Sequence, residues 1–417
     1  MKSLCIVLLA SISGCAFVQS VLAAELPKAK EKVLHSFGIG GDGLSPQTAL
    51  INVNGMLYGT TLSGGSSGTG TLFELDPKTR MEKVLYSFCT RQSCLDGASP
   101  CGSLINLNGI LYGTTSAGGE SGDGTVYSLD PSTVTEKVLY SFCNQSVGCT
   151  DGSFPIASLL DINGTLYGVT TSGGDNDGGV VFAIDLRTGA EKVVYSFCSQ
   201  QKCADGNEPT GNLINVKGTL YGITDQGGST NCEYGCGTVF SLNPNTGAEK
   251  VLYSFCAQNN CTDGSFPYGA LIEKRGTLYG TTAAGGANCV SESGCGTAFA
   301  LNPGTGVETV LYSFCSQPNC ADGWLPDDGL VEAKGNLYGT THQGGNTGCY
   351  NNQGCGVAFS LDPNTHAETV LYTFCSLENC VDGAWPFAGL IDVKHTLYGT
   401  TLLGGTDDIG TVFSLTR

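Results

Sequence analysis

The chain has 417 residues, of which 62 are Gly and only 13% are charged, against about 25% in an average domain. Hydrophobic residues make up 41%, which suits a turn-rich β protein with a packed core and excludes wholesale disorder. The formal net charge of −18 disfavours nucleic acid and anionic membrane surfaces as partners. Cationic partners and divalent ions remain compatible with this charge.

The first 24 residues predict a secretory signal peptide, because one Lys is followed by a long apolar run and then by small residues. The mature chain is expected to begin near Ala24 or Glu25, with residues 25–30 as a lead-in. In a second interpretation, the segment ISGC is a lipid-attachment box that makes Cys15 a lipidated N-terminus. No later run reaches the ~18 apolar residues of a spanning helix. We therefore expect a monomer that is secreted, periplasmic or attached to the cell surface, without a transmembrane segment.

Three short motifs recur seven times with a period of 54 to 60 residues, which indicates a tandem repeat. The motif LYG begins at Leu57, Leu111, Leu166, Leu220, Leu278, Leu337 and Leu397. A Tyr or His two residues before Phe occurs at His35, Tyr86, Tyr140, Tyr195, Tyr253, Tyr312 and Tyr372. The motif DGxxP begins at Asp42, Asp96, Asp151, Asp205, Asp263, Asp322 and Asp382. Residues 31–417 are therefore expected to form one repeat domain.

Each repeat contains four short runs of β-branched and aromatic residues, separated by turn signals. In the third repeat these runs are 158–163, 165–171, 179–185 and 191–197, and we call such strands a, b, c and d. Asn163-Gly164 suits a tight hairpin turn between a and b, and the segment DLRTGA suits a turn between c and d. Four antiparallel strands per repeat predict the blade of a β-propeller.

The two ends of the repeat array predict a closed ring. The array begins with a d-type strand at 31–37 and ends with a c-type strand at 410–416, so the last repeat lacks one strand. If the N-terminal strand completes the last blade, no sheet edge stays open. An open solenoid would instead need distinct capping repeats. The sequence therefore predicts an all-β, seven-bladed propeller.

The repeat unit NGxLYGTTxxGGxxxxGTVFSLxPxTGxEKVLYSF resembles the GloVer-type tandem repeat of secreted bacterial proteins across residues 31–417. This resemblance implies a seven-bladed propeller in surface or extracellular proteins. The family is largely uncharacterised, so the resemblance implies no particular ligand or activity.

The cysteines fall into close pairs in two kinds of loop, and an exported protein favours disulfides over metal sites for them. The d-to-a loops hold Cys89/Cys94, Cys143/Cys149, Cys198/Cys203, Cys256/Cys261, Cys315/Cys320 and Cys375/Cys380. The b-to-c loops hold Cys232/Cys236, Cys289/Cys295 and Cys349/Cys355, and Cys101 is left over. Zinc bound by two neighbouring pairs, and disulfides between neighbouring loops, remain alternatives. Because strand direction alternates, both kinds of loop should emerge on one face, which we call the Cys-loop face.

The repeated Asp of DGxxP is expected to cap backbone N–H groups of a turn, with Pro starting strand a. A ring of seven such carboxylates that binds Ca²⁺ is the alternative, although no copy carries the ligand string of a calcium loop. We therefore predict no cofactor or metal site, with calcium left open.

Residues that break the repeat are the better candidates for function. At one varying position near the end of strand b, Asp225 and His342 are the ionisable members. Around the start of strand a, repeats six and seven carry Trp324, Asp327, Asp328, Trp385 and Phe387. Aromatic rings beside carboxylates are typical of a sugar or cation pocket, although random variation of exposed loops explains the same pattern.

The leading functional hypothesis is a non-enzymatic module that binds an unknown protein or glycan on the Cys-loop face, with no catalytic residue assigned. The alternative is a carbohydrate-active enzyme, a lyase or glycosidase, that uses Asp327 or Asp328 with His342 at the channel mouth. A structural component of the cell envelope is the third hypothesis. The enzyme hypothesis requires Trp324, Asp327, His342 and Trp385 to line one pocket.

Overall fold

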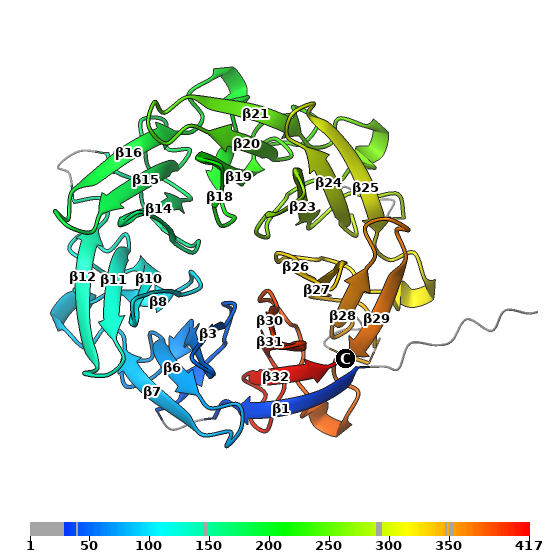
Figure 1. The fold of residues 1–417 in the computed structure, drawn as a ribbon, viewed down its shortest axis with the longest axis horizontal. Helices are drawn as coiled ribbons and strands as arrows, with labels where there is room; N and C mark the ends of the chain where they lie inside the picture. Colours follow the sequence, from blue (N-terminus) through cyan, green and yellow to red (C-terminus); the bar gives the residue numbers. More distant parts are fainter. Residues whose placement is uncertain (1–28, 39–40, 145–147, 289–293, 347, 350–352) are drawn as a thin grey trace, which may run out of the picture.

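Seven antiparallel sheets are arranged in a ring around a central axis (Figure 1). The computed structural model describes residues 29–38, 41–144, 148–288, 294–346, 348–349 and 353–417. The expected signal segment 1–24, including Cys15, and the cysteine Cys289 lie outside the described residues. The sequence prediction of an all-β, seven-bladed propeller is confirmed.

In blades 1 to 6 the strands follow one another in chain order from the axis outward, and blade 7 differs only in its outer strand, which is the first strand of the chain. Blade 1 contains β3 (Ile51–Val53), β4 (Met56–Thr61), β6 (Thr71–Leu75) and β7 (Glu82–Ser87). Blade 2 contains β9 (Ile105–Leu107), β10 (Ile110–Ala117), β11 (Thr125–Asp130) and β12 (Thr135–Ser141), with β8 (Ala98–Pro100) beside β10. Blade 3 contains β13 (Leu160–Ile162), β14 (Thr165–Thr170), β15 (Val180–Asp185) and β16 (Glu191–Ser196). Blade 4 contains β18 (Ile214–Val216), β19 (Thr219–Gln226), β20 (Thr238–Leu242) and β21 (Glu249–Ser254), with β17 (Asn207–Pro209) beside β19.

The remaining blades repeat this order. Blade 5 contains β22 (Ile272–Lys274), β23 (Thr277–Thr282), β24 (Thr297–Asn302) and β25 (Val307–Ser313). Blade 6 contains β26 (Val331–Ala333), β27 (Asn336–Thr341), β28 (Val357–Leu361) and β29 (Glu368–Thr373). Blade 7 contains β30 (Ile391–Val393), β31 (Thr396–Thr401), β32 (Thr411–Thr416) and β1 (Lys30–Ser36). A short pair, β2 (Gly43–Leu44) and β5 (Ser63–Gly64), lies beside blade 1.

The first strand of the chain closes the ring, as the sequence predicts. Strand β1 pairs antiparallel with β32, from Lys30 opposite Thr416 to Ser36 opposite Thr411. Figure 1 shows β1, in dark blue, outside β32, in red. Because this pairing joins the two ends of the array, blade 7 gains its outer strand and the ring has no gap between its first and last blades.

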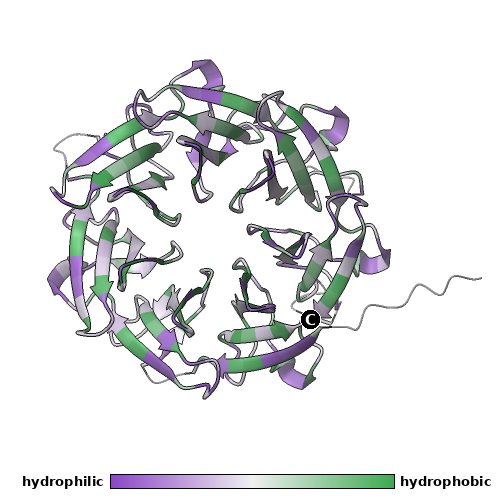
Figure 2. Ribbon diagram, viewed as in Figure 1, coloured by the Kyte–Doolittle hydropathy of each residue, from purple (hydrophilic) through white to green (hydrophobic). Residues whose placement is uncertain are grey.

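The repeated Phe of each unit packs between neighbouring blades. Phe88, at the end of the outer strand of blade 1, is fully buried and makes edge-to-face contacts with Tyr86 and with Tyr127 of blade 2. The same arrangement recurs between later blades, for example Phe142 with Phe182. Figure 2 shows hydrophobic residues along the strands and hydrophilic residues on the outer loops. These motifs therefore form the scaffold of the ring.

The aspartate of DGxxP caps backbone N–H groups of the loop that leads into a blade, as expected. In blade 4, Asp205 accepts hydrogen bonds from the Tyr195 hydroxyl at 2.8 Å and from the backbone N–H groups of Ser199 at 2.9 Å and Gln200 at 3.1 Å. Its exposed fraction is 0%. The repeated Tyr and Asp are thus joined in one structural unit, and calcium binding by these aspartates stays a prediction.

Eight of the nine expected cysteine pairs form local disulfides. These are Cys89–Cys94, Cys143–Cys149, Cys198–Cys203, Cys232–Cys236, Cys256–Cys261, Cys315–Cys320, Cys349–Cys355 and Cys375–Cys380. The pair Cys289/Cys295 involves a residue outside the described ranges. Cys101 is the free cysteine of the described part of the chain.

The two kinds of disulfide loop lie on the same face of the ring. The Cys349 sulfur in a b-to-c loop is 4.0 Å from the Cys380 sulfur in the following d-to-a loop. Five d-to-a loops each include one 3₁₀ turn that ends on the second cysteine: η1 (Gln92–Cys94), η2 (Gln201–Cys203), η3 (Asn259–Cys261), η4 (Pro318–Cys320) and η6 (Glu378–Cys380). Many disulfides fit an extracellular or periplasmic protein. Within the described ranges, no helix is long and apolar enough to cross a membrane.

Candidate ligand site at the channel mouth

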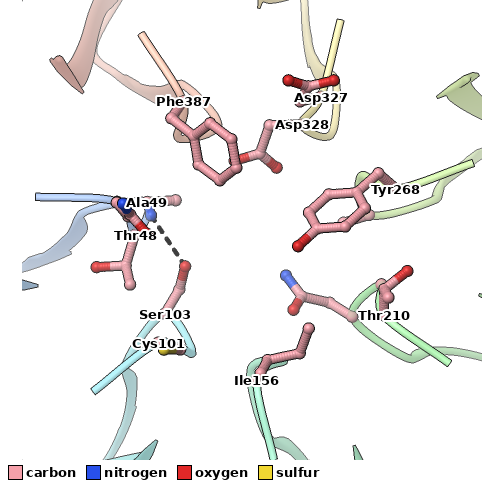
Figure 3. A pocket seen from close by; sticks show the side chains of 14 residues that line it. Thr48, Ala49, Cys101, Ser103, Ile156, Thr210, Tyr268, Asp327, Asp328 and Phe387 are labelled. Carbon is pink, nitrogen blue, oxygen red and sulfur yellow. Dashed lines mark hydrogen bonds between the residues drawn. The ribbon is translucent and has the colours of Figure 1, made fainter. Parts of the chain in front are cut away.

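A cavity opens at the axis where the innermost strands begin, on the Cys-loop face. Its empty volume is about 680 Å³, part of which is open solvent. Every blade contributes the residue that directly follows the Pro of DGxxP: Gln47, Cys101, Ile156, Thr210, Tyr268, Asp327 and Phe387. The seven repeats therefore place seven different side chains at one equivalent position, so the wall of the cavity differs chemically from one blade to the next (Figure 3).

Small residues let the blades approach closely beneath this ring of side chains. A Cβ on Gly269 would lie 2.2 Å from the backbone carbon of Asp328, so that position has no room for a side chain. Hydrogen bonds join neighbouring blades there, including Ala49 N–H to Ser103 Oγ at 3.0 Å (Figure 3) and Thr281 Oγ1 to the Asp328 carbonyl at 2.9 Å. The lining side chains therefore stand on a rigid support.

Two adjacent carboxyl groups, Asp327 and Asp328, line one side of the cavity. The Asp328 carboxylate accepts a hydrogen bond from the Gly329 N–H. Protein atoms surround Asp328 on most sides although part of its surface stays open, and this burial, assisted by the charge of Asp327, raises its pKa to about 7. Asp225 of β19 lies nearby without lining the cavity, and burial followed by Glu208 and Asp327 raises its pKa to about 7. This side of the site therefore gathers three carboxyl groups, and burial keeps two of them partly protonated near neutral pH.

The His342 imidazole holds the Asp327 carboxyl group in position. Its Nδ1 atom lies 3.1 Å from Asp327 Oδ2, and both side chains are 15% exposed. The His342 ring contacts Trp385 and Phe387 edge to face, with ring centres 5.1 and 5.4 Å away. The remaining His342 nitrogen, Nε2, is buried without a hydrogen-bond partner. The imidazole thus fixes the orientation of Asp327 and packs against the aromatic side of the site.

Aromatic rings from blades 5 and 7 flank the carboxyl groups. The Tyr268 and Phe387 rings are 6.4 Å apart, and both line the cavity. Burial, followed by the charges of Asp225 and Asp327, raises the pKa of Tyr268 to about 12, so its hydroxyl stays protonated and can donate a hydrogen bond. Figure 3 shows Phe387, Asp328 and Tyr268 across the cavity from Cys101, Ser103 and Ile156.

The structure brings together most of the predicted site residues, but not all. Asp327, Asp328 and Phe387 line the cavity, and His342, Trp385 and Asp225 lie next to it. Trp324 is not among the lining residues, because its indole packs on the core between blades 5 and 6 and donates to the Gln353 carbonyl at 3.0 Å. The four residues that the enzyme hypothesis requires therefore do not line one pocket. The functional roles of the others stay predictions.

Tyr268 and Thr210 are cavity residues that sequence reasoning missed. Their signal is variation: the residue after the DGxxP proline differs in all seven repeats, whereas the flanking motif is constant. Cys101 occupies the same position in blade 2, and its thiol contacts the Ser99 carbonyl at 3.2 Å and Ser116 Oγ at 3.3 Å. Burial raises the pKa of this thiol, which keeps it protonated and a poor nucleophile.

The fold and this cavity define a disulfide-bonded repeat propeller whose seven blades place different side chains around the channel mouth. A sequence profile of the Gloeobacter/Verrucomicrobia repeat matches residues 20–234 and 230–417. The chain therefore belongs to that repeat family, as its motifs indicate. No curated protein matches the chain.

Three solved structures show a distant overall similarity to this chain. An oligogalacturonate lyase from Vibrio parahaemolyticus has 10% identity and a TM-score of 0.49, with 93% of this chain and 97% of that chain covered. A nidogen/laminin complex has 14% identity and a TM-score of 0.43, with 72% and 89% covered. TolB from Acinetobacter baumannii has 14% identity and a TM-score of 0.39, with 72% and 58% covered. Similarities at this level carry no argument about ligand or activity.

Proposed function

We propose that the protein is an exported glycan-binding module whose ligand occupies the channel mouth. The observation that supports this proposal most strongly is the pairing of two carboxyl groups, Asp327 and Asp328, with two aromatic rings, Tyr268 and Phe387, around one cavity. Aromatic rings offer flat apolar faces to the C–H groups of a sugar ring, and carboxylates accept hydrogen bonds from its hydroxyl groups. The signal-like segment 1–24 and the disulfides support a location outside the cytoplasm.

The charge of the cavity restricts the class of glycan. The described residues that line it include two Asp and no Lys or Arg. Acidic sugars would place further carboxylates beside Asp327 and Asp328 without a compensating cation, which like-charge repulsion disfavours. We therefore infer a neutral or amine-bearing glycan. Ser103, Thr210 and Asn212, which also line the cavity, supply additional polar groups for its hydroxyls.

A glycan-array screen followed by isothermal titration calorimetry tests the proposal. Wild type is compared with a Tyr268→Ala, Phe387→Ala double variant and with Tyr234→Ala, which removes a 69% exposed Tyr outside the cavity. We expect neutral or amine-bearing glycans to bind wild type and Tyr234→Ala equally. The double variant should bind at least about tenfold more weakly, because about 1.4 kcal/mol of ring contact corresponds to that factor. Absence of glycan binding by wild type, or equal binding by the double variant, contradicts the proposal.

The enzyme hypothesis in the form predicted from the sequence fails, because its four residues do not line one pocket. An enzyme that uses the Asp327 and Asp328 pair alone is the second candidate function. It is favoured by the Asp328 carboxyl, whose pKa of about 7 suits a general acid, beside Asp327 held by His342. Incubation of the bound glycan with wild type and Asp328→Asn discriminates between the two candidates. An enzyme releases new reducing or unsaturated ends in the wild-type sample only, whereas a binding module leaves the glycan intact in both.

A further inference from the structure

The seam that closes the ring differs chemically from the other six. At those six seams, the tyrosine of the outer strand donates a hydrogen bond to the buried aspartate, and the loop between them carries a cysteine pair. The six pairs are Tyr86–Asp96, Tyr140–Asp151, Tyr195–Asp205, Tyr253–Asp263, Tyr312–Asp322 and Tyr372–Asp382. At the closing seam, His35 of β1 replaces the tyrosine, and residues 36–43 contain no cysteine. A metal-binding residue type thus appears at the one seam whose loop lacks a disulfide.

Three potential metal ligands converge at this seam. His35 Nε2 lies 3.1 Å from Asp42 Oδ2, and one ligand atom from each of His35, Asp42 and Glu82 lies within 4.8 Å of the other two. Two ligands on one tetrahedral zinc ion are about 3.3 Å apart, given bond lengths near 2.0–2.2 Å. The His–Asp spacing already matches this value, and a rotation of the flexible Glu82 side chain is enough to bring its carboxylate into place.

The surroundings orient two of the ligands and leave the third without a partner. Asp42 accepts hydrogen bonds from the N–H groups of Gly38 at 3.2 Å and Gly43 at 2.8 Å, which fix its carboxylate. The His35 ring packs edge to face on Phe37, with centres 4.8 Å apart. Glu82 Oε1 is buried and has no hydrogen-bond partner, like the equivalent glutamate oxygen at each of the other seams. The feature that distinguishes this seam is therefore the imidazole beside the two carboxyl groups.

The local charge also favours a cation, because the carboxyl groups of Asp42 and Glu82 lie close together beside the imidazole. A divalent ion would neutralise both carboxylates. One imidazole and two carboxylates form a ligand set that Zn²⁺ and other first-row divalent ions accept, and water can fill the remaining position.

We propose that His35, Asp42 and Glu82 bind one divalent transition-metal ion, best matched by Zn²⁺, that fastens the N-terminal strand to blade 1. Asp42 and Glu82 belong to the first blade, whereas His35 lies on the strand that pairs with the C-terminal β32. The ion would therefore bridge the two ends of the ring. In this role it takes the place of the disulfide that stabilises the other six loops.

Calorimetry with ZnCl₂ on the mature, untagged chain, stripped with EDTA, tests the site. His35→Tyr introduces the residue found at the other six seams, so this variant is compatible with the fold. Glu82→Gln removes a ligand, whereas Glu191→Gln changes the equivalent glutamate at a seam without histidine and serves as the matched control. We expect one zinc ion per chain in wild type and in Glu191→Gln. Binding should weaken at least about 100-fold in His35→Tyr and at least about tenfold in Glu82→Gln.

Two further measurements distinguish metal bound at the seam from metal bound by surface histidines, and show whether the ion stabilises the whole fold. Co²⁺ bound at the seam should give the visible absorption of a low-symmetry site in wild type but not in His35→Tyr. Saturating Zn²⁺ should raise the Tm of wild type by a few degrees and leave that of His35→Tyr unchanged. Zinc binding by His35→Tyr as tight as that of wild type, or no stoichiometric binding by wild type, overturns the proposal.

Discussion

Replacement of Glu308 by Gln should stabilise the protein at alkaline pH but not at pH 5. Glu308 lies on β25, at the seam of blades 4 and 5, where its two carboxyl oxygens are buried without hydrogen-bond partners. Burial, followed by the nearby Asp263, raises its pKa from 4.5 to about 8. Asp263 is fully buried and accepts hydrogen bonds from the Tyr253 hydroxyl and from the Ala257 and Gln258 N–H groups.

The sign of the effect follows from proton binding. Between pH 4.5 and 8 the folded chain holds the Glu308 proton and the unfolded chain has released it, so the free energy of unfolding falls as pH rises through this window. At about 1.4 kcal/mol for each pKa unit, the upper limit is about 5 kcal/mol. Partial exposure of Glu308 to water reduces the expected effect to about 1–2 kcal/mol. Gln cannot ionise, so the variant escapes this cost.

Urea unfolding at pH 5 and pH 9, followed by tryptophan fluorescence, measures the difference. Glu308→Gln should match wild type at pH 5 and gain about 1–2 kcal/mol at pH 9. The control, Glu120→Gln, changes an exposed loop glutamate and should have no effect at either pH. A gain for Glu308→Gln that is equal at both pH values, or a loss at pH 9, would refute the reasoning.

Three further substitutions test other parts of the scaffold. Tyr127→Phe should stabilise the protein by about 1 kcal/mol, because the Tyr127 hydroxyl is fully buried without a partner and the equivalent residue of the other blades is Phe. Urea unfolding should show a higher midpoint for the variant, and a lower midpoint contradicts this account. Gly269→Ala should lower the free energy of unfolding by at least about 2 kcal/mol, since the new methyl group would lie 2.2 Å from the Asp328 backbone; an unchanged Tm would show that the blades do not approach this closely. The Cys256→Ser, Cys261→Ser double variant should lose about 2 kcal/mol and become more sensitive to proteolysis in that loop, and equal resistance to protease would count against a structural disulfide.

The architecture could be predicted well from the sequence because each of the seven repeats places the same residue types at equivalent positions. The Phe after each repeated Tyr, such as Phe88, fills the gap between blades, and each aspartate such as Asp205 caps a loop. The missing strand of the last repeat identified β1 as the closing strand. Local spacing was also enough to pair cysteines such as Cys256 and Cys261, since a loop of six residues has few alternative partners.

The site was predicted only in part, because its residues meet through the closure of the ring and not through proximity in the chain. Tyr268 and Phe387 are 6.4 Å apart, yet more than 100 positions separate them in the sequence. Trp324 shows the opposite error: its position near a carboxylate pair indicated a site residue, but the direction of its side chain takes it to the core between blades 5 and 6. The His35 cluster was missed because His35 and Asp42 meet Glu82 only where β1, as the outer strand of blade 7, packs beside blade 1.

The location of the glycan can be measured directly with Cys101, the free thiol in the wall of the cavity. Because the Cys101 thiol is protonated and reacts slowly, its alkylation by excess iodoacetamide at pH 8.5 is followed over hours, with and without a saturating glycan identified by the array. A ligand in the channel mouth should slow alkylation at least about tenfold by excluding the reagent, and an acidic glycan of the same length should give no protection. An alkylation rate unchanged by a bound glycan would place its site elsewhere on the propeller and contradict the account.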